Sequence, residues 1–74
     1  GAKVPNHKKN SYMEYTEIAE AIEHVSAKFA DEGRVLIRPS GTEPLVRVMI
    51  EGRDQALIER EARELAELIQ NVML

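Results

Sequence analysis

Two short apolar stretches, separated by a loop that begins near one proline and ends at another, place the strongest constraint on how this chain can fold. Residues 34–37 read Arg-Val-Leu-Ile and residues 45–50 read Leu-Val-Arg-Val-Met-Ile, so both stretches are rich in β-branched side chains. Such stretches are typical of strands, and the turn-forming residues between them indicate a hairpin. The pattern therefore predicts two antiparallel strands, over residues 34–38 and 44–51.

Amphipathic helices are predicted on both sides of this hairpin. Residues 15–30 repeat apolar side chains at helical spacing, and Thr16 is a suitable N-cap. The apolar stripe of this helix comprises Ile18, Ile22, Val25 and Phe29. A second helix is predicted from an N-cap at Asp54 to about residue 71. Its apolar stripe comprises Ile58, Ala62, Leu65, Leu68, Ile69 and Val72.

Residues 1–14 show no clear period. Residues 2–4 are interpreted as the tail of an edge strand, a place where the following Pro5 is tolerated. Residues 6–11 are polar and are predicted to form a mobile loop, with Lys9 and its charged neighbours in solvent. The element order is then β-α-β-β-α. This order predicts an α+β fold, a small antiparallel β-sheet with two helices packed on one face.

Length and composition limit the classes of partner. The chain has 74 residues, which predicts a single domain over residues 1–74. Its net charge of −3, from 10 basic and 13 acidic residues, argues against a nucleic-acid partner. No apolar run approaches the roughly 18 residues of a membrane span and no signal peptide is visible, so no membrane partner is expected. The absence of cysteine fits a reducing compartment, and a cytoplasmic location is predicted.

The loop at residues 38–44, Arg-Pro-Ser-Gly-Thr-Glu-Pro, concentrates hydrogen-bond donors suited to one small anion. Arg38 offers a planar fork of N–H groups that matches the oxygens of a phosphate. Ser40 and Thr42 offer hydroxyl groups, and the amides of Gly41 and Thr42 are predicted to point at the ligand. A proline near each end of the loop lowers the entropy that is lost when the loop becomes ordered.

Arg47, in the second strand, is predicted to add another guanidinium group. Side chains alternate between the faces of a strand, so closing the hairpin with Arg38 opposite Leu45 makes Arg38 and Arg47 diagonal neighbours on one face. Glu43 is assigned a structural part, accepting hydrogen bonds from Arg47 or from loop amides. The candidate phosphate-binding residues are therefore Arg38, Ser40, Gly41, Thr42 and Arg47, with Pro39, Glu43 and Pro44 supporting the loop.

Other interpretations of this region stay open. Each residue of the loop favours turns, so the loop could simply reverse the chain. A small domain of this topology could also be a stand-alone regulatory module that binds an anion or another metabolite. A P-loop is excluded, because there is no Gly-Lys-Ser/Thr and no helix directly follows the glycine. The acidic charge, the lack of a Gly-x-x-Gly loop and the lack of exposed aromatic residues on the strands argue against RNA binding.

Residues 33–52 closely resemble the C-terminal (fourth) domain of the bacterial phosphoglucosamine mutases, a branch of the α-D-phosphohexomutase superfamily. The resemblance rests on the loop motif together with the preceding Gly-Arg-Val-Leu-Ile and the following Leu-Val-Arg-Val-Met-Ile-Glu-Gly. Relatives that act on mannose or glucose phosphates more often carry Asn where Gly41 stands, and they differ at Glu43. This favours the glucosamine branch, with a phosphomannomutase or phosphoglucomutase relative as the alternative.

The resemblance implies a TBP-like fold and an isomerase that interconverts glucosamine 6-phosphate and glucosamine 1-phosphate. The reaction would be an intramolecular phosphoryl transfer through a bisphosphate intermediate, on the route to UDP-N-acetylglucosamine and cell-wall precursors. The phosphate-binding loop of the family maps onto Arg38, Ser40, Gly41 and Thr42, with Arg47 as a further candidate. The phosphoserine, the Mg²⁺ held by aspartates and the sugar-reading loop would lie in three other domains of such an enzyme. This chain alone is then expected to hold no catalytic residue and no metal, and to be inactive.

Overall fold

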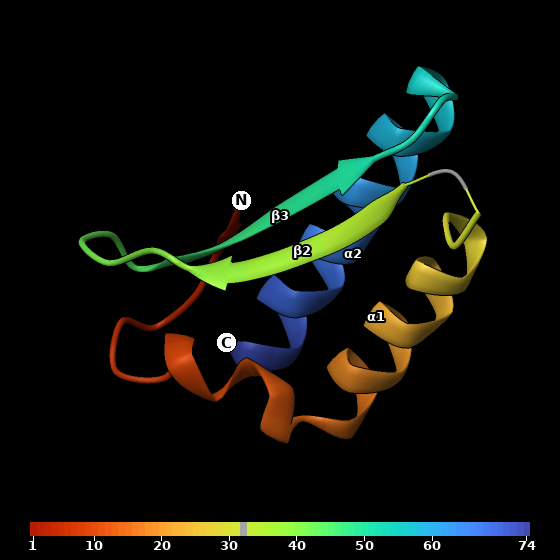
Figure 1. Ribbon diagram of the computed structural model, residues 1–74. Helices are drawn as coiled ribbons and strands as arrows, with labels where there is room; N and C mark the ends of the chain where they lie inside the picture. Colours follow the sequence, from red (N-terminus) through yellow and green to blue (C-terminus); the bar gives the residue numbers. More distant parts are fainter. Residues whose placement is uncertain (32) are drawn as a thin grey trace.

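A three-stranded antiparallel sheet with two helices on one of its faces forms the framework of the protein (Figure 1). The computed structural model describes residues 1–31 and 33–74. Its elements are β1 (Ala2–Lys3), a 3-10 helix (Lys9–Glu14), α1 (Thr16–Lys28), β2 (Arg34–Pro39), β3 (Leu45–Glu51) and α2 (Gln55–Met73). The strand order is β1-β3-β2, so β3 is the central strand. The predicted α+β class and the β-α-β-β-α order are confirmed.

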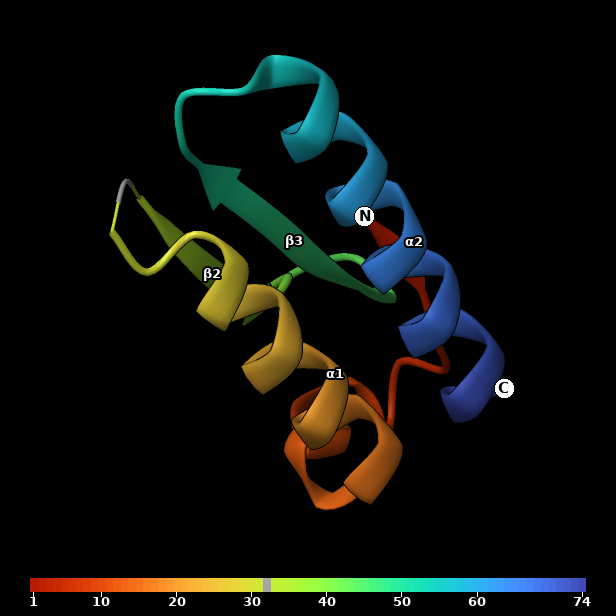
Figure 2. The same ribbon diagram turned by 90° about the vertical axis from the view of Figure 1, so that its right-hand side faces the viewer.

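The two helices lie over the same face of the sheet and contact each other (Figure 2). The largest fully buried side chains are Ile18 of α1, Val46 of β3, and Ile69 and Met73 of α2. Alternate side chains of β2 and β3 pack against this core: Val35, Ile37, Val48 and Ile50. The other face of the sheet carries Arg38, Arg47 and Met49, which are exposed. The sheet therefore presents its apolar side to the helices and its charged side to solvent.

The register of the hairpin differs by two residues from the predicted one. Arg38 pairs with Arg47, whereas the prediction placed Arg38 opposite Leu45. The reason is that the hairpin closes at Ser40, whose backbone amide donates a hydrogen bond to the carbonyl oxygen of Leu45 at 2.9 Å. A shift of two residues leaves every side chain on its predicted face. The two arginines are consequently direct cross-strand partners instead of diagonal neighbours.

The apolar stripe predicted for α1 is confirmed, because Ile18, Val25 and Phe29 are all buried. The predicted cap at Thr16 is wrong: the N-cap is Tyr15, whose side chain makes no capping hydrogen bond. The 3-10 helix runs directly into α1, and the amide of Tyr15 donates to the carbonyl oxygen of Tyr12 at 3.4 Å. Tyr15 itself is extended, with φ −88° and ψ 115°, so one extended residue joins the two helices and its side chain does not cap α1.

The start of α2 is confirmed, because the carboxylate of Asp54 accepts a hydrogen bond from the amide of Leu57 at 3.1 Å. The helix continues to Met73, beyond the predicted end at residue 71. Its buried side chains are Glu61, Leu65, Ile69 and Met73. This line is rotated from the predicted stripe, whose remaining members, Ile58, Ala62, Leu68 and Val72, are only half-buried. The hydrophobic pattern could not predict that Glu61 would be one of the buried residues of α2.

The prediction of a mobile polar loop over residues 6–11 is wrong in its second half. Lys9 begins the 3-10 helix and is buried, because its ammonium group reaches the carbonyl oxygen of Glu43 at 3.1 Å. The expected strand tail at the N-terminus is confirmed as β1, with Ala2 paired to Val46. The chain before α1 therefore packs along the end of the hairpin where the loop lies.

Glu61 is a carboxylate buried between the two helices. It is 5% exposed, and Nζ of Lys28 in α1 lies 2.5 Å from its Oε1. Nε of Arg60 lies 3.6 Å from the other oxygen, Oε2. The hydrogen bond from Lys28 is the main reason that the pKa of Glu61 is lowered from its ordinary 4.5, although burial acts in the opposite direction. The ion pair links α1 to α2.

We expect the stability of the fold to depend on the ionisation of Glu61. Because its pKa is lower in the folded than in the unfolded state, its contribution is complete above pH 4.5 and is lost as the pH falls through the folded-state pKa. Glu61→Gln should be less stable than the wild type by about 1–3 kcal/mol at neutral pH, since a charge-assisted hydrogen bond is lost in a buried place.

Chemical unfolding followed by circular dichroism at pH 7 and pH 3 measures this difference, which should shrink at the lower pH. Glu64→Gln changes an exposed glutamate on the same helix and serves as the control. A gap between Glu61→Gln and the wild type that is equally large at both pH values would contradict the prediction.

Candidate anion-binding site

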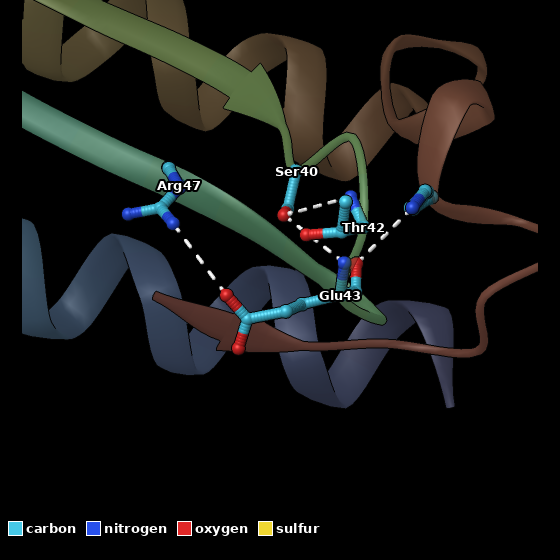
Figure 3. Close-up of polar contacts among 5 residues, drawn as sticks. Ser40, Thr42, Glu43 and Arg47 are labelled. Atoms are coloured by element: carbon cyan, nitrogen blue, oxygen red, sulfur yellow. Dashed lines mark hydrogen bonds and ion pairs between the residues drawn. The ribbon is translucent and has the colours of Figure 1, made fainter.

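The loop between β2 and β3 is folded around the side chain of Ser40. The hydroxyl oxygen of Ser40 accepts hydrogen bonds from the backbone amides of Thr42 at 3.4 Å and Glu43 at 3.1 Å (Figure 3). Serine often stabilises a turn in this way, by replacing a backbone acceptor. Ser40 is 6% exposed. Its hydroxyl proton is still a donor that another acceptor can use.

The amides of the loop differ in part from the prediction. The amide of Thr42 donates to Ser40 instead of pointing at a ligand. Within the described residues, no hydrogen bond uses the amide of Gly41. A Cβ atom added at Gly41 would meet no atom within 4 Å, and the φ angle of Gly41 is not positive. Neither the packing nor the backbone of this chain therefore requires a glycine at this position.

Arg38 and Arg47 face each other across β2 and β3. Both are exposed, on the sheet face that the helices leave uncovered. Oε1 of Glu43 lies 3.6 Å from Nη2 of Arg47, whereas no ion pair joins Arg38 to another described residue. Like charges directly opposite each other destabilise a pair of strands. The two guanidinium groups together therefore favour an anion between them.

One open pocket of about 350 Å³ lies beside these side chains. It is lined by Arg38, Pro39, Ser40, Gly41, Thr42, Arg47 and Met49. The structure thus brings together around one space all of the residues predicted to bind phosphate. Met49 was missed, although strand parity places it on the same face as Arg47. It is 52% exposed and adds an apolar wall.

The last two residues of the loop lie outside this pocket. Glu43 and Pro44 line a neighbouring apolar pocket together with Val4 and Leu45. The carbonyl oxygen of Pro44 accepts a hydrogen bond from the amide of Val4 at 3.0 Å, which extends the pairing of β1 with β3. These contacts tie the end of the loop to the N-terminal strand.

Lys9 is a contact of the loop that sequence reasoning missed. Its Nζ donates to the carbonyl oxygen of Glu43, the contact that Figure 3 draws as a dashed line from Glu43 to the 3-10 helix. Tyr12 follows three residues later, and its hydroxyl donates to the carbonyl oxygen of Ile37 at 3.1 Å. Residues three apart lie on the same side of a 3-10 helix. The Lys-x-x-Tyr spacing could have indicated that both side chains face the hairpin, but only if the segment had already been known to be a 3-10 helix.

Magnesium prefers carboxylate, carbonyl and water oxygens. Among residues 1–31 and 33–74, no group of three or more His, Cys, Asp or Glu side chains lies close enough together to hold a metal ion. No residue of the described chain is therefore assigned to the implied Mg²⁺.

A search of the described helices for a membrane-spanning segment finds none with the length and apolar character that crossing a bilayer requires.

Comparison with known proteins shows similarity along most of the chain. Residues 2–68 match the family described as phosphoglucomutase/phosphomannomutase, C-terminal domain. The chain is also similar to curated proteins named phosphoglucosamine mutase. It is 65% identical over 68 residues to the one from Clostridium botulinum (strain Eklund 17B / Type B), 59% over 69 residues to that of Thermoanaerobacter sp. (strain X514), and 55% over 69 residues to that of Clostridioides difficile (strain 630).

These alignments cover 92%, 93% and 93% of this chain, respectively. They cover 15% of each relative, so the chain spans about 15% of the length of the curated relatives that it matches. The family match over residues 2–68 includes α1, the hairpin with its loop, and α2 as far as residue 68.

Proposed function

Because the chain belongs to the family of phosphoglucomutase/phosphomannomutase C-terminal domains, we propose that it is the phosphate-binding domain of a phosphoglucosamine mutase. The names and the high identity of its relatives support the choice of this enzyme. The proposed enzyme is an isomerase that interconverts glucosamine 6-phosphate and glucosamine 1-phosphate through a bisphosphate intermediate. Its product would feed the synthesis of UDP-N-acetylglucosamine in the cytoplasm.

The observation that carries this proposal is the cross-strand pair of Arg38 and Arg47 beside the pocket of the loop. A guanidinium group presents parallel N–H donors that match two oxygens of one phosphate. The hydroxyl groups of Ser40 and Thr42 belong to residues that line the same pocket. The site contains two guanidinium groups and one nearby carboxylate, that of Glu43, so it keeps a net positive charge. A phosphate dianion would offset the repulsion between the two arginines.

A site of this kind recognises the phosphate group, and its binding of a ligand does not depend on the sugar that carries the phosphate. The polar side chains that line the pocket belong to Arg38, Ser40, Thr42 and Arg47, and each of them carries a hydrogen-bond donor. Such a site can hold either end of a sugar bisphosphate, which suits an intermediate that must be used in both orientations. We assign the domain the part of a lid. When it closes, contacts at the loop position the phosphosugar and help to exclude water.

The remaining chemistry is assigned to the other three domains of the proposed enzyme. They would supply the nucleophilic serine, the Mg²⁺ that neutralises charge during phosphoryl transfer, and the groups that read the sugar. Those domains and the phosphosugar are then the partners of this one. The chain alone should have no mutase activity, and turnover by the pure chain would contradict this assignment.

Titrating the ¹⁵N-labelled chain with inorganic phosphate tests the proposal. We expect amide shifts centred on residues 40–42 and a dissociation constant of about a millimolar, because a few charge-assisted hydrogen bonds offset only part of the cost of association. Glucosamine 6-phosphate should cause similar shifts, and glucosamine should cause none. Selective binding of a non-phosphorylated metabolite would instead support a stand-alone regulatory module.

Gly41→Ala is a matched variant for the same titration. The new methyl group meets no protein atom within 4 Å, and the φ angle is not positive, so the fold should change in stability by less than about 1 kcal/mol. The methyl group narrows the space at the loop, and we expect phosphate to bind roughly tenfold more weakly. An unchanged affinity would remove Gly41 from the site.

A phosphomannomutase or phosphoglucomutase is the second candidate, since the matched family carries both names. A site that reads phosphate alone does not separate these substrates. Assays of the complete enzyme with glucosamine, mannose and glucose phosphates would decide between the candidates.

A further inference from the structure

A lysine side chain reaches from the 3-10 helix to the anion-binding loop. The buried polar side chains of the described chain are Lys9, Ser40 and Glu61. Glu61 joins the two helices, whereas Lys9 and Ser40 both bond to Glu43. Lysine is almost never so deeply buried unless its charge is paired. Among the described residues, no carboxylate forms an ion pair with Lys9. A salt bridge therefore does not explain its position.

The contacts of Glu43 show what Lys9 does. The amide of Glu43 donates to the hydroxyl oxygen of Ser40 at 3.1 Å. The carbonyl oxygen of Glu43 accepts from Nζ of Lys9 at 3.1 Å and from the amide of Leu45 at 2.8 Å. The peptide group before Glu43 is thus bonded to Ser40, which belongs to the loop. The peptide group after Glu43 is bonded to Lys9, which lies outside the loop. A hydrogen bond from a charged donor is stronger than a neutral one.

The same helix also holds the other arm of the hairpin. The hydroxyl of Tyr12 donates to the carbonyl oxygen of Ile37 at 3.1 Å, immediately before Arg38. Tyr12 and Lys9 therefore bond to the chain immediately before and immediately after residues 38–42, which line the pocket. The 3-10 helix is placed as a support for the end of the hairpin that carries the anion site.

We propose that Lys9 is a positioning residue that keeps the loop in its anion-binding shape before a ligand arrives. This inference rests on the proposed function, because it concerns how the same site is kept ready. A loop that is already ordered loses less conformational entropy on binding. If removal of the restraint leaves only a fraction of molecules with a competent loop, the apparent affinity falls by that fraction. Lys9 acts through Glu43 and Ser40 and makes no contact with the anion itself.

The substitution Lys9→Met tests the proposal, because it keeps the aliphatic length and removes the donor. We expect the amides of Thr42 and Glu43 to exchange their hydrogens faster, relative to amides of β2 and β3. We also expect the dissociation constant for inorganic phosphate to rise roughly fivefold. Lys9→Arg restores a charged donor and should recover most of both effects. Rescue by arginine separates the hydrogen bond from mere filling of space.

Lys28→Met is the matched control, since it removes the other lysine that bonds to a buried partner. It should lower the melting temperature without changing the phosphate affinity or the relative exchange of the loop amides. An equal rise of the phosphate dissociation constant in Lys28→Met and Lys9→Met would overturn the proposal, because general destabilisation would then explain both.

The outcomes separate this inference from the proposed function. Loop exchange in Lys9→Met equal to that of the wild type would overturn the inference, whether or not phosphate binds. Phosphate binding that is unchanged in Lys9→Met would also overturn it and leave the proposed function intact. If the wild type bound no phosphate while loop exchange rose in Lys9→Met, the proposed function would fail and the hold of Lys9 on the loop would be supported.

A second measurement covers the case in which Lys9→Met does not fold. The ammonium protons of Lys9 in the wild type should exchange with water several times more slowly than those of the exposed Lys3. Equal rates would overturn the proposal, since a buried and bonded ammonium group must be protected.

Discussion

Replacing Arg38 with alanine is expected to lower kcat/KM of the proposed complete mutase by about 100-fold or more, with little change in the stability of this domain. The variant loses a guanidinium that can make two charge-assisted hydrogen bonds to one phosphate, each contributing about 1.5–3 kcal/mol. Arg38 is exposed and forms no ion pair with another described residue, so the fold should not depend on it. Steady-state kinetics and thermal unfolding of the same variant measure the two effects.

Arg34→Ala is the matched control for this experiment. Arg34 lies on the same strand and the same face as Arg38, but its Nε is 2.6 Å from Oε1 of Glu51, at the other end of the hairpin from the loop. We expect its loss to change kcat/KM by less than about twofold, because exposed ion pairs contribute little. Equal losses in the two variants would mean that the general positive charge of this face matters and that Arg38 has no specific part.

The substitution Val46→Asp is expected to unfold the domain. Val46 lies on the central strand with 0% of its surface exposed, packed between the sheet and the helices. An unpaired carboxylate at this position costs several kcal/mol, which is comparable with the total stability of about 5 kcal/mol that a domain of this size has. Circular dichroism and the dispersion of amide signals would show the loss of structure.

Met49→Asp tests whether the face of the strand is what matters. Met49 stands on the same strand, but on the uncovered face, with 52% of its surface exposed. We expect this variant to stay folded, with a change in stability below about 1 kcal/mol. A folded Val46→Asp combined with an unfolded Met49→Asp would mean that the apolar face of β3 is the opposite one.

The elements that were predicted correctly are those with a local signal. The hairpin and α1 follow from apolar spacing within a dozen or so neighbouring residues. The N-cap of α2 follows from one aspartate before an amphipathic stretch, and its hydrogen bond to Leu57 confirms it. The pocket was predictable in outline because Arg38, Ser40, Gly41, Thr42 and Arg47 lie within or next to one loop.

The features that were missed depend on contacts between distant residues. Lys9 bonds to Glu43, 34 positions along the chain, and Lys28 bonds to Glu61, 33 positions along. A buried lysine or glutamate contradicts the hydrophobic pattern, and only the partner explains its position. The register was wrong for a different, local reason: the hairpin closes at Ser40, whose backbone amide donates to the carbonyl oxygen of Leu45 and whose hydroxyl oxygen accepts from loop amides. None of these bonds has a periodic signature in the sequence.

At the proposed anion site, the carboxylate of Glu43 would compete with the incoming anion for Arg47. Its oxygen lies 3.6 Å from the guanidinium nitrogen and both side chains are 58% exposed, so this ion pair is weak. A dianion can displace it at little cost in free energy, and the carboxylate can return as the dianion departs. Such an exchange keeps the charge near Arg47 partly neutralised throughout, so departure does not expose an uncompensated cation. If the proposed enzyme releases and rebinds its bisphosphate intermediate, we expect this internal substitute to ease the release.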